Sequence, residues 1–554
     1  MPHWRLRLWG PAIGRVRPIV CQEGSGLTDT QIDAPGKAGG PSGPGAGRAR
    51  RLVRGWSANL VQLVLGLTQQ LLLIPAFLHV WTGDMLAAWL AIYAAGSLVV
   101  VADAGLQLRA INRFFAFKSC ADCDGRTASF YARMLRIYVA VVVVLGILLL
   151  AVTHVLRPSA LLGFRGTASF DSAFIVMTLG MLLCLPGNLA SGLYRARGQY
   201  GRTVWLLNVV LLLGQIAQLF AIAWFGSLLA VAIAFISMQL LFAAFMLVDA
   251  PRLFPFLRRA GAYRARPRSW SSTLRWNIGQ FGRAFPFAIA NITELALVNL
   301  PVLLVSALVT DRVAVAQWGL TRVIASLVRG LCLQLAVPLA AELGHDHAVG
   351  DRARLSRLYA QGSVFVTVLA SLIVAGLLPF WGDFFTLWTH GSIPYDAGLA
   401  VTLLLGSAAA APSLLALAFA SHSNRGDLLI RTKGLQLVVF LVLSFVLTSW
   451  LGPLGAALAV VASDILVQFG LLALVIMGQT LQHPLRHTGF LVLVSVVIVL
   501  SGWGAGVVAA LLVPGAGLVH FLAECAIWLI FAAVAASPLI IKSVRETLIA
   551  AIPR

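Results

Sequence analysis

The feature that most constrains this chain is a succession of long apolar segments in which charged residues are almost absent. A helix of about 20 apolar residues crosses the hydrocarbon core of a bilayer, and the sequence supplies such a run fourteen times from Ser57 onward. With 59% hydrophobic residues and a mean hydropathy of +0.90, the chain is too apolar for a soluble protein of 554 residues. The sequence therefore predicts an all-α polytopic membrane protein. Its spans are predicted at residues 57–80, 85–106, 137–156, 171–193, 203–225, 227–248, 284–309, 313–341, 361–382, 397–420, 434–450, 453–477, 488–513 and 517–541.

Lysine and arginine collect on one side of these predicted spans. If the amino terminus is cytoplasmic, 27 of the 41 basic residues fall in cytoplasmic loops and the carboxyl tail, and 9 precede Ser57. Only three, Arg157, Arg165 and Arg312, fall in outer loops. Because short positive loops stay in the cytoplasm, both termini are predicted to be cytoplasmic. The same rule accounts for the net charge of +21, so no nucleic-acid partner is predicted.

The ends of the chain and its cysteines suggest no site. Residues 1–56 are basic and broken by Pro and Gly, which predicts a disordered tail, and residues 542–554 form a short cytoplasmic tail. Cys120 and Cys123 form a CxxC pair, but a zinc site needs two further ligands at matching spacing. No metal or cofactor is predicted. No Gly-rich phosphate loop, His-Glu pair or nucleophile elbow indicates an enzyme.

The chain repeats itself at an offset of 226 residues, which corresponds to six helices. Pro75 pairs with Pro301, and Pro186 pairs with Pro412. At the same offset Trp224, Gly226, Leu228, Ala230 and Ser237 pair with Trp450, Gly452, Leu454, Ala456 and Ser463. An even number of spans preserves orientation, so the sequence predicts two parallel six-helix lobes, 57–248 and 284–477, with a site between them. Two extra helices follow within residues 488–541.

The segment between the lobes, residues 249–283, is the most basic loop, with eight arginines beside Trp270 and Trp276. Anionic headgroups attract such a segment by about 1 kcal/mol for each basic residue near the surface, and tryptophan favours the interface. We therefore expect a cytoplasmic loop that contacts anionic phospholipids. A specific gate for substrate is the alternative interpretation.

Two arginines, Arg322 and Arg329, are the only basic residues inside the predicted spans. A guanidinium at mid-bilayer depth costs on the order of 3 kcal/mol on insertion scales, so each one needs a partner or a function. Seven residues make nearly two helical turns, which places both side chains on one helix face about 10 Å apart. The pair therefore predicts a cationic stripe inside the membrane.

Glu294 and Asp464 are the candidate partners of these arginines. Residue counts from the helix ends place Glu294 level with Arg329, and Asp464 level with Arg322. The alternatives are a structural ion pair for at least one arginine, or a free stripe that binds phosphate through paired charge-assisted hydrogen bonds. Amide side chains in the spans are candidate contacts for sugar hydroxyls or for neighbouring helices: Asn59, Gln62, Gln69, Asn208, Gln215, Asn291, Asn299 and Gln436.

Several short motifs occur at defined places in this pattern. The opening helices contain Pro75, Gly83-Asp84 and Asp103-Ala104-Gly105-Leu106, and the eighth contains Trp318-Gly319-Leu320-Thr321-Arg322, with Pro338 and Gly350-Asp351 after it. Over residues 57–541, these motifs resemble the polysaccharide flippases of the multidrug, oligosaccharidyl-lipid and polysaccharide exporter superfamily. The seventh helix of that family often carries an Asp near the position of Asn299, so this chain leaves cation coupling open.

The resemblance implies a function. It implies that two rocking lobes move an undecaprenyl-pyrophosphate-linked oligosaccharide from the inner to the outer leaflet of a bacterial inner membrane. Arg322 and Arg329 would meet the pyrophosphate. Asn59, Gln69, Asn299, Glu294 and Asp464 would complete the substrate site. Polysaccharide polymerases and glycosyltransferases are the implied protein partners.

Two other functions compete with this interpretation. A drug or cation antiporter of the same architecture would use acidic cavity residues, and Glu294 and Asp464 support it. A membrane glycosyltransferase or polymerase would need a sizeable outer loop with acids or histidines. The longest outer loops, 157–170 and 383–396, hold no paired carboxylates besides Asp383 and Asp396, which argues against an enzyme.

Overall fold

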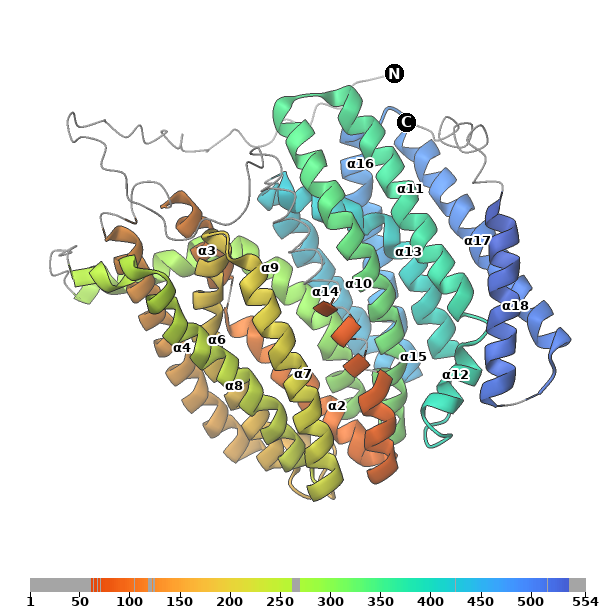
Figure 1. The fold of residues 1–554 in the computed structure, drawn as a ribbon, viewed down its shortest axis with the longest axis horizontal. Helices are drawn as coiled ribbons and strands as arrows, with labels where there is room; N and C mark the ends of the chain where they lie inside the picture. The colour runs from red at the N-terminus through yellow and green to blue at the C-terminus, as the bar shows by residue number, and fades with distance from the viewer. Residues whose placement is uncertain are drawn as a thin grey trace, which may run out of the picture.

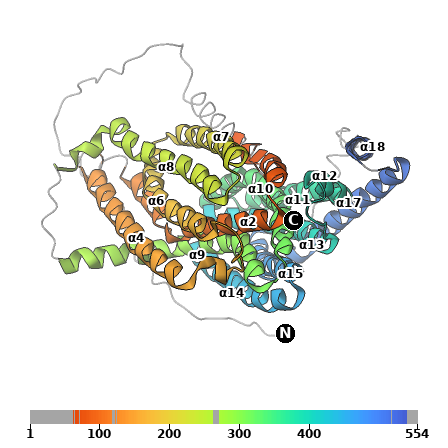
Figure 2. The ribbon, with the colours of Figure 1, turned by 90° about the horizontal axis from the view of Figure 1, so that it is seen from below.

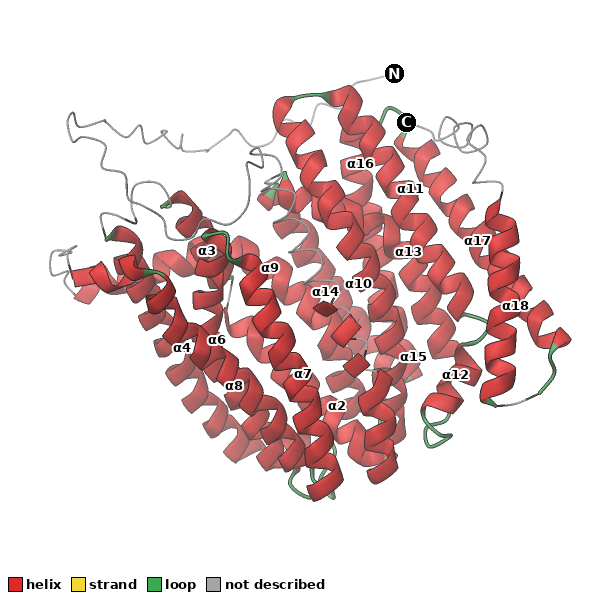
Figure 3. Cartoon of the chain, in the orientation of Figure 1, coloured by secondary structure: helices red, strands yellow, loops and turns green. Residues whose placement is uncertain are grey.

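The computed structural model describes residues 61–62, 64–66, 68–69, 71–103, 105–117, 122, 125–261, 270–423, 425–515 and 517–537. Within these ranges the chain forms helices and no strand (Figure 3). The predicted tails at 1–56 and 542–554 lie outside the described residues. The elements are α2 (Gly83–Leu98), η1 (Val99–Asp103), α3 (Leu106–Ala116), α4 (Arg126–Leu156), α5 (Pro158–Leu161), α6 (Phe170–Ala196), α7 (Tyr200–Phe225), α8 (Leu228–Leu253), η2 (Pro255–Gly261), α9 (Trp270–Leu308), α10 (Arg312–Val349), α11 (Arg352–Leu377), α12 (Trp381–Trp388), α13 (Ala397–His422), α14 (Gly426–Leu451), α15 (Pro453–Ser463), η3 (Asp464–Ala473), α16 (Leu474–Thr480), α17 (Pro484–Leu512) and α18 (Leu518–Ala536).

Twelve helices in the described part of the chain are long and apolar enough to cross a membrane, and each overlaps one predicted span. Two shorter apolar helices, Val64–Val80 and Leu518–Val534, fall on the first and last predicted spans. The prediction of an all-α polytopic fold is therefore confirmed. The outward faces of these helices carry many exposed Leu, Val, Ile and Phe side chains, as a surface in contact with lipid requires.

The helices gather into two groups (Figure 1). Helices α4, α6, α7 and α8 lie on one side, and α10, α11 and α13–α16 lie on the other, with α17 and α18 at the far edge in both views (Figures 1 and 2). Helix α2 packs against α6 in the first group, against α10 in the second, and against α9. Its small residues Ala87, Ala88 and Ala91 are fully buried, which allows the close approach of helices on several sides.

Helix α9 connects the two groups. Trp276, Phe281 and Ala284 in its first half pack into the apolar cluster of α3, α4, α6 and α8, whereas Ala296 and Leu297 pack against α14 and α15. The predicted inter-lobe segment 249–283 is helical at both ends, because α8 continues to Leu253 and α9 begins at Trp270, and its place in the cytoplasm stays a prediction. The apolar contacts of Trp276 and Phe281 with the first group favour a helix there. Residues 262–269 lie outside the described part.

Some residues of the predicted repeat occupy matching places in the fold. Gly226 ends α7 and Gly452 ends α14, with φ of 62° and 59°, a backbone conformation that favours glycine. Pro186 and Pro412 both lie inside long helices, α6 and α13. These matches agree with two related halves, and the superposition of one half on the other stays a prediction.

Candidate functional site

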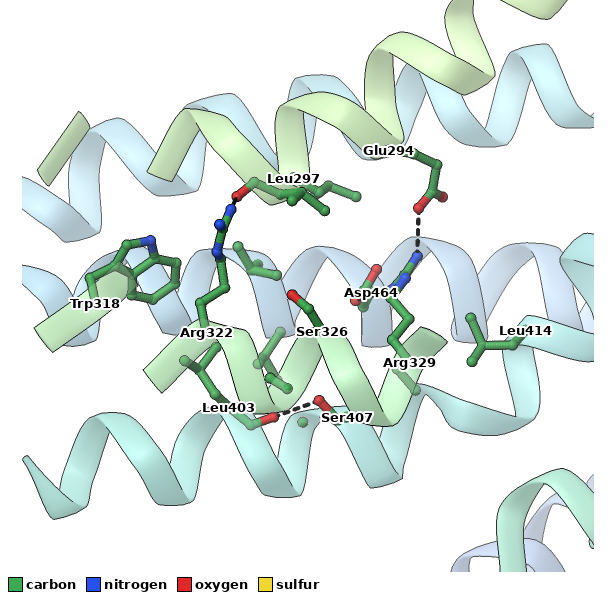
Figure 4. A pocket seen from close by; sticks show the side chains of 16 residues that line it. Glu294, Leu297, Trp318, Arg322, Ser326, Arg329, Leu403, Ser407, Leu414 and Asp464 are labelled. Carbon is green, nitrogen blue, oxygen red and sulfur yellow. Dashed lines mark hydrogen bonds and ion pairs between the residues drawn. The ribbon is translucent and has the colours of Figure 1, made fainter. Parts of the chain in front are cut away.

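Helix α10 places both predicted arginines on one cavity. Arg322, Ala325 and Arg329 line it together with Trp318, as their spacing of three, four and seven residues requires (Figure 4). The opposite walls come from α9, α13, α15 and η3, and the cavity encloses about 70 Å³. All of its lining residues belong to the predicted second lobe. The expected position between the two lobes is therefore wrong for this cavity.

Arg329 is held by two carboxylates. One guanidinium nitrogen lies 2.9 Å from Glu294 Oε2 on α9, and the other lies 2.9 Å from Asp464 Oδ2 at the start of η3. The prediction that Glu294 lies at the same membrane depth as Arg329 agrees with this ion pair. The prediction that Asp464 lies at the depth of Arg322 does not, because Asp464 also pairs with Arg329. Helical side chains lean toward the helix amino terminus, and the long Arg329 side chain shifts its charge in that direction, which residue counts ignore. The alternatives were a structural ion pair or a free guanidinium that binds phosphate, and Arg329 forms the structural ion pair.

A second cation, Lys433, completes the network, although it lies outside the span predicted at residues 434–450. Helix α14 begins at Gly426 rather than at residue 434, so Lys433 lies two turns inside it and its side chain is only 1% exposed. Its ammonium donates to Glu294 Oε1 at 2.5 Å, to Gln436 Oε1 at 2.8 Å and also to Gln468 Oε1. The prediction that Arg322 and Arg329 are the only Lys or Arg residues inside the spans is therefore wrong. The ammonium escapes the cost of burial because three oxygens replace water.

Amides and a hydroxyl connect the charges of this network. Gln436 Nε2 donates to Asp464 Oδ1 at 2.7 Å, and Gln468 Nε2 donates to Ser413 Oγ on α13 at 2.7 Å. Asp464 and Gln468 begin and continue a π-helical segment, Asp464–Ala473, between α15 and α16. Such wide turns are rare and frequently occur at functional sites. Here the π-helical segment turns both polar side chains toward Arg329 and Lys433.

The four charged groups of this network balance. Arg329 and Lys433 carry two positive charges, and Glu294 and Asp464 carry two negative ones, each within hydrogen-bonding distance of an opposite charge. The Glu294 side chain is 33% exposed and that of Asp464 is 10% exposed, so the network opens toward the cavity mainly through Glu294. An electroneutral, fully paired cluster favours structural stability over capture of a second anion.

Arg322 differs from Arg329 because no carboxylate pairs with it among the described residues. Its guanidinium donates to the Val298 carbonyl oxygen on α9, while its Nε is buried without an acceptor. The indole N–H of Trp318, one turn away on the same cavity wall, is also buried without an acceptor. Arg322 lies close enough to the Tyr93 hydroxyl of α2 to interact with it electrostatically. One end of the cavity thus carries a positive charge and two unused N–H donors.

The other predicted site residues do not join the cavity. Asn299 is buried on α9 and donates to the Leu295 carbonyl oxygen of its own helix at 3.1 Å, which leaves it the role of an ordinary helix amide. Gln69 is half-buried on the helix Val64–Val80 and is not among the lining residues. Asn59 lies outside the described residues. Gln215 instead donates to the Leu65 carbonyl oxygen at 2.9 Å, a contact between helices.

One signal in the sequence would have revealed Lys433. Lys433, Gln436, Ser444 and Thr448 recur at helical spacing and are all buried along one face of α14. A polar stripe at that period extends the helix to positions before residue 434. Gln468 carried no such signal, because its partners lie on other helices.

Comparison with known proteins supports the fold. No protein-family model matches the chain, and no curated protein matches its sequence. A structure of the lipid II flippase MurJ in an inward closed conformation has a TM-score of 0.65 at 13% identity, over 88% of this chain and 99% of that one. An inward-facing multidrug resistance transporter of the MATE family and MOP superfamily has a TM-score of 0.55 at 14% identity, over 78% and 98%. The eukaryotic MATE transporter AtDTX14 gives 0.53 at 15% identity, over 78% and 96%.

These similarities extend over nearly the whole length of each solved structure, so the likeness concerns the complete fold rather than one helix bundle. The solved proteins are transporters, and none of them is an enzyme. The chain is accordingly a multi-pass membrane protein with the fold that the lipid II flippase MurJ shares with the MATE transporters.

Proposed function

We propose that the protein is a flippase that moves an undecaprenyl-pyrophosphate-linked oligosaccharide from the inner to the outer leaflet of a bacterial inner membrane. It would act by alternating access as a member of the polysaccharide-exporting branch of its superfamily. Its MurJ-like fold supports a lipid-linked substrate. Polysaccharide polymerases and glycosyltransferases, which would consume and supply that substrate, are the proposed partners.

The proposal depends on one observation, that Arg322 lines the cavity without a carboxylate partner among the described residues. A buried guanidinium without a carboxylate is costly at membrane depth, and such groups mark substrate pathways. Its Nε–H and the indole N–H of Trp318 are buried donors that find no acceptor among the described residues, and both side chains line the cavity. A pyrophosphate supplies negative charge and several strong acceptor oxygens, so it fits this pair of donors. Arg329, predicted to share the task, is instead neutralised by Glu294 and Asp464.

The cavity is too small for the proposed substrate, so the helices around it must move during transport. Its 70 Å³ is about the volume of two or three water molecules, far less than a pyrophosphate with its first sugar. The helices around Arg322 must therefore separate before substrate enters. Arg322 lies beside α9 and near Tyr93 of α2, the two helices that contact both helix groups, so separation of those groups would widen this end first.

The test is flipping of a lipid-linked oligosaccharide in proteoliposomes, measured as glycan that becomes accessible to an added glycosidase. Arg322→Lys keeps the charge but loses the planar fork, and Arg322→Ala loses both, so we expect a strong loss in the first and abolition in the second. Arg357→Lys and Arg357→Ala, at an exposed arginine of α11, make the same changes and should leave flipping unchanged. Wild-type flipping by Arg322→Ala would refute the proposal.

A drug or cation antiporter is the second candidate, and one observation favours it. Glu294 and Asp464 line the cavity, and Glu294 is a third exposed, as a cation-binding carboxylate would be. Both carboxylates are already neutralised by Arg329 and Lys433, which leaves little negative charge for a cationic drug. Export of a cationic dye that survives Arg322→Ala but fails in Glu294→Gln would favour the antiporter.

A further inference from the structure

Helix α3 has the distribution of apolar and basic side chains that is typical of a helix in a membrane interface. Leu106, Ala110 and Phe114 are fully buried on one face, against the cluster of α4, α6 and α8. Leu108 and Phe115, seven residues apart on another face, are 38% and 54% exposed. Arg109 and Arg113 fall between these two faces, as the angle of about 100° per residue dictates. Exposed apolar side chains flanked by cations suit the boundary between headgroups and acyl chains.

Three arginines converge at this helix. Arg109 and Arg113 are one turn apart on α3, and Arg283 lies on α9, which packs on α3, close enough to Arg109 to interact with it electrostatically. Burial, together with the nearby charges of Arg113 and Arg283, lowers the pKa of Arg109. Arg109 Nε is buried without an acceptor. Arg113 lies 5.9 Å from the ring of Phe117 and makes no ion pair among the described residues.

Among the described residues, the carboxylates near these arginines are already engaged. Asp103, just before α3, accepts from the Tyr138 hydroxyl and from the backbone N–H of Gln107. Asp122 pairs with Arg197 at 2.5 Å and accepts from Thr127 at 2.6 Å. Like charges held together without a counter-charge repel one another, so the cluster lacks a counter-charge as far as the described part of the chain builds it. An external anion would supply the missing charge.

We propose that Arg109, Arg113 and Arg283 form a binding site for the phosphate of an anionic phospholipid. Guanidinium forks bind phosphate oxygens in pairs, and the exposed Leu108 and Phe115 would lie among the acyl chains of the same lipid. The charge bias of the loops predicts that this end of the helices faces the cytoplasm, the leaflet in which the site would take its lipid. A lipid so held would tie α3 to the first half of α9.

The test measures lipid binding by the purified full-length protein. Delipidated protein in detergent is titrated with phosphatidylglycerol, with phosphatidylcholine and with glycerol phosphate alone, and bound lipid is counted by native mass spectrometry. We expect the double variant Arg109→Gln with Arg283→Gln to weaken phosphatidylglycerol binding about tenfold, because paired charge-assisted hydrogen bonds are lost. Arg275→Gln removes an exposed charge from the same helix and should leave binding unchanged.

Each outcome decides the proposal. Weaker phosphatidylglycerol binding in the double variant only, with phosphatidylcholine and glycerol phosphate bound weakly throughout, supports a lipid site. Equal loss in Arg275→Gln would show a diffuse basic surface and overturn it. Glycerol phosphate bound as tightly as the lipid would show a site for a soluble anion and also overturn it. If the double variant does not give a monodisperse protein, Arg283→Gln alone, at an exposed position, provides the same comparison.

Discussion

Removal of Arg329 tests whether the charge network holds the second helix group together. The side chain forms ion pairs of 2.9 Å with both Glu294 and Asp464. In Arg329→Ala the two carboxylates keep different partners. Glu294 retains the Lys433 ammonium at 2.5 Å, whereas Asp464 retains only a neutral amide, Gln436, at 2.7 Å. The stranded charge would therefore be Asp464, whose side chain is the more buried of the two.

The loss of stability expected in Arg329→Ala follows from the exposed fractions of the two carboxylates. Removal of one partner of a buried ion pair costs about 3 to 5 kcal/mol, and pairs in contact with solvent cost much less. Because Glu294 is a third exposed and keeps Lys433, most of the loss comes from Asp464. We expect Arg329→Ala to lower the free energy of unfolding by about 3 kcal/mol. Addition of Asp464→Asn should restore about half or more of it, and addition of Glu294→Gln should restore less.

The assay is reversible unfolding of the purified protein in mixed micelles with increasing SDS, beside the flipping assay on the same preparations. Arg322→Ala is the internal control, because it breaks no ion pair and should keep wild-type stability while it loses transport. Recovery of both stability and flipping in Arg329→Ala with Asp464→Asn would show that Arg329 is structural. An Arg329→Ala protein within about 0.5 kcal/mol of wild type, the range of neutral surface changes, would refute the network as a stabilising element.

Three more predictions follow from the described contacts. Lys433→Met should cost about 3 kcal/mol in the same unfolding assay, because Glu294 and two amide oxygens lose their buried donor; a stable Lys433→Met would contradict the assigned contacts. In a cysteine-free background, Ser392→Cys should react with an impermeant thiol reagent added outside and Ser421→Cys should not, and the opposite result would invert the predicted orientation. Gly455→Ala should lower stability by about 1 to 3 kcal/mol, because a Cβ there would overlap the Leu447 carbonyl oxygen of α14, whereas Gly478→Ala has open space and serves as control.

The fold was predictable because a bilayer leaves few options. A spanning segment must satisfy its own backbone hydrogen bonds, so hydropathy alone fixes a helix and its approximate length. Helix ends follow less directly from hydropathy, because a helix can continue beyond its apolar run. The predicted span 434–450 leaves Lys433 out of α14, and the predicted span 284–309 leaves the turn around Trp276 out of α9. In both places tertiary contacts extend the helix: oxygens around the ammonium, and an apolar cluster around the indole.

The candidate site was predictable in its residues and less so in its partnerships. Spacing on one helix placed Arg322 and Arg329 on one cavity, because helical geometry alone decides which side chains share a face. Their different roles depend on residues elsewhere in the chain: Glu294 is 35 residues from Arg329 and Asp464 is 135 residues away. Neither distance in sequence predicts a distance in space.

The separation of roles between the two arginines has a consequence for any mechanism. A charge that must bind and release an anion has to remain unpaired for part of the cycle, which is tolerable only where water or substrate reaches it. Arg322 meets the first condition, with a backbone carbonyl as its hydrogen-bonded partner and an unused Nε–H beside the cavity. Arg329 also lines the cavity and its side chain is 23% exposed, but it is paired twice, so its release would require two carboxylates to find other cations. Transport of an anionic headgroup through this site must therefore depend on Arg322 far more than on Arg329, although the two residues share a helix face and a cavity.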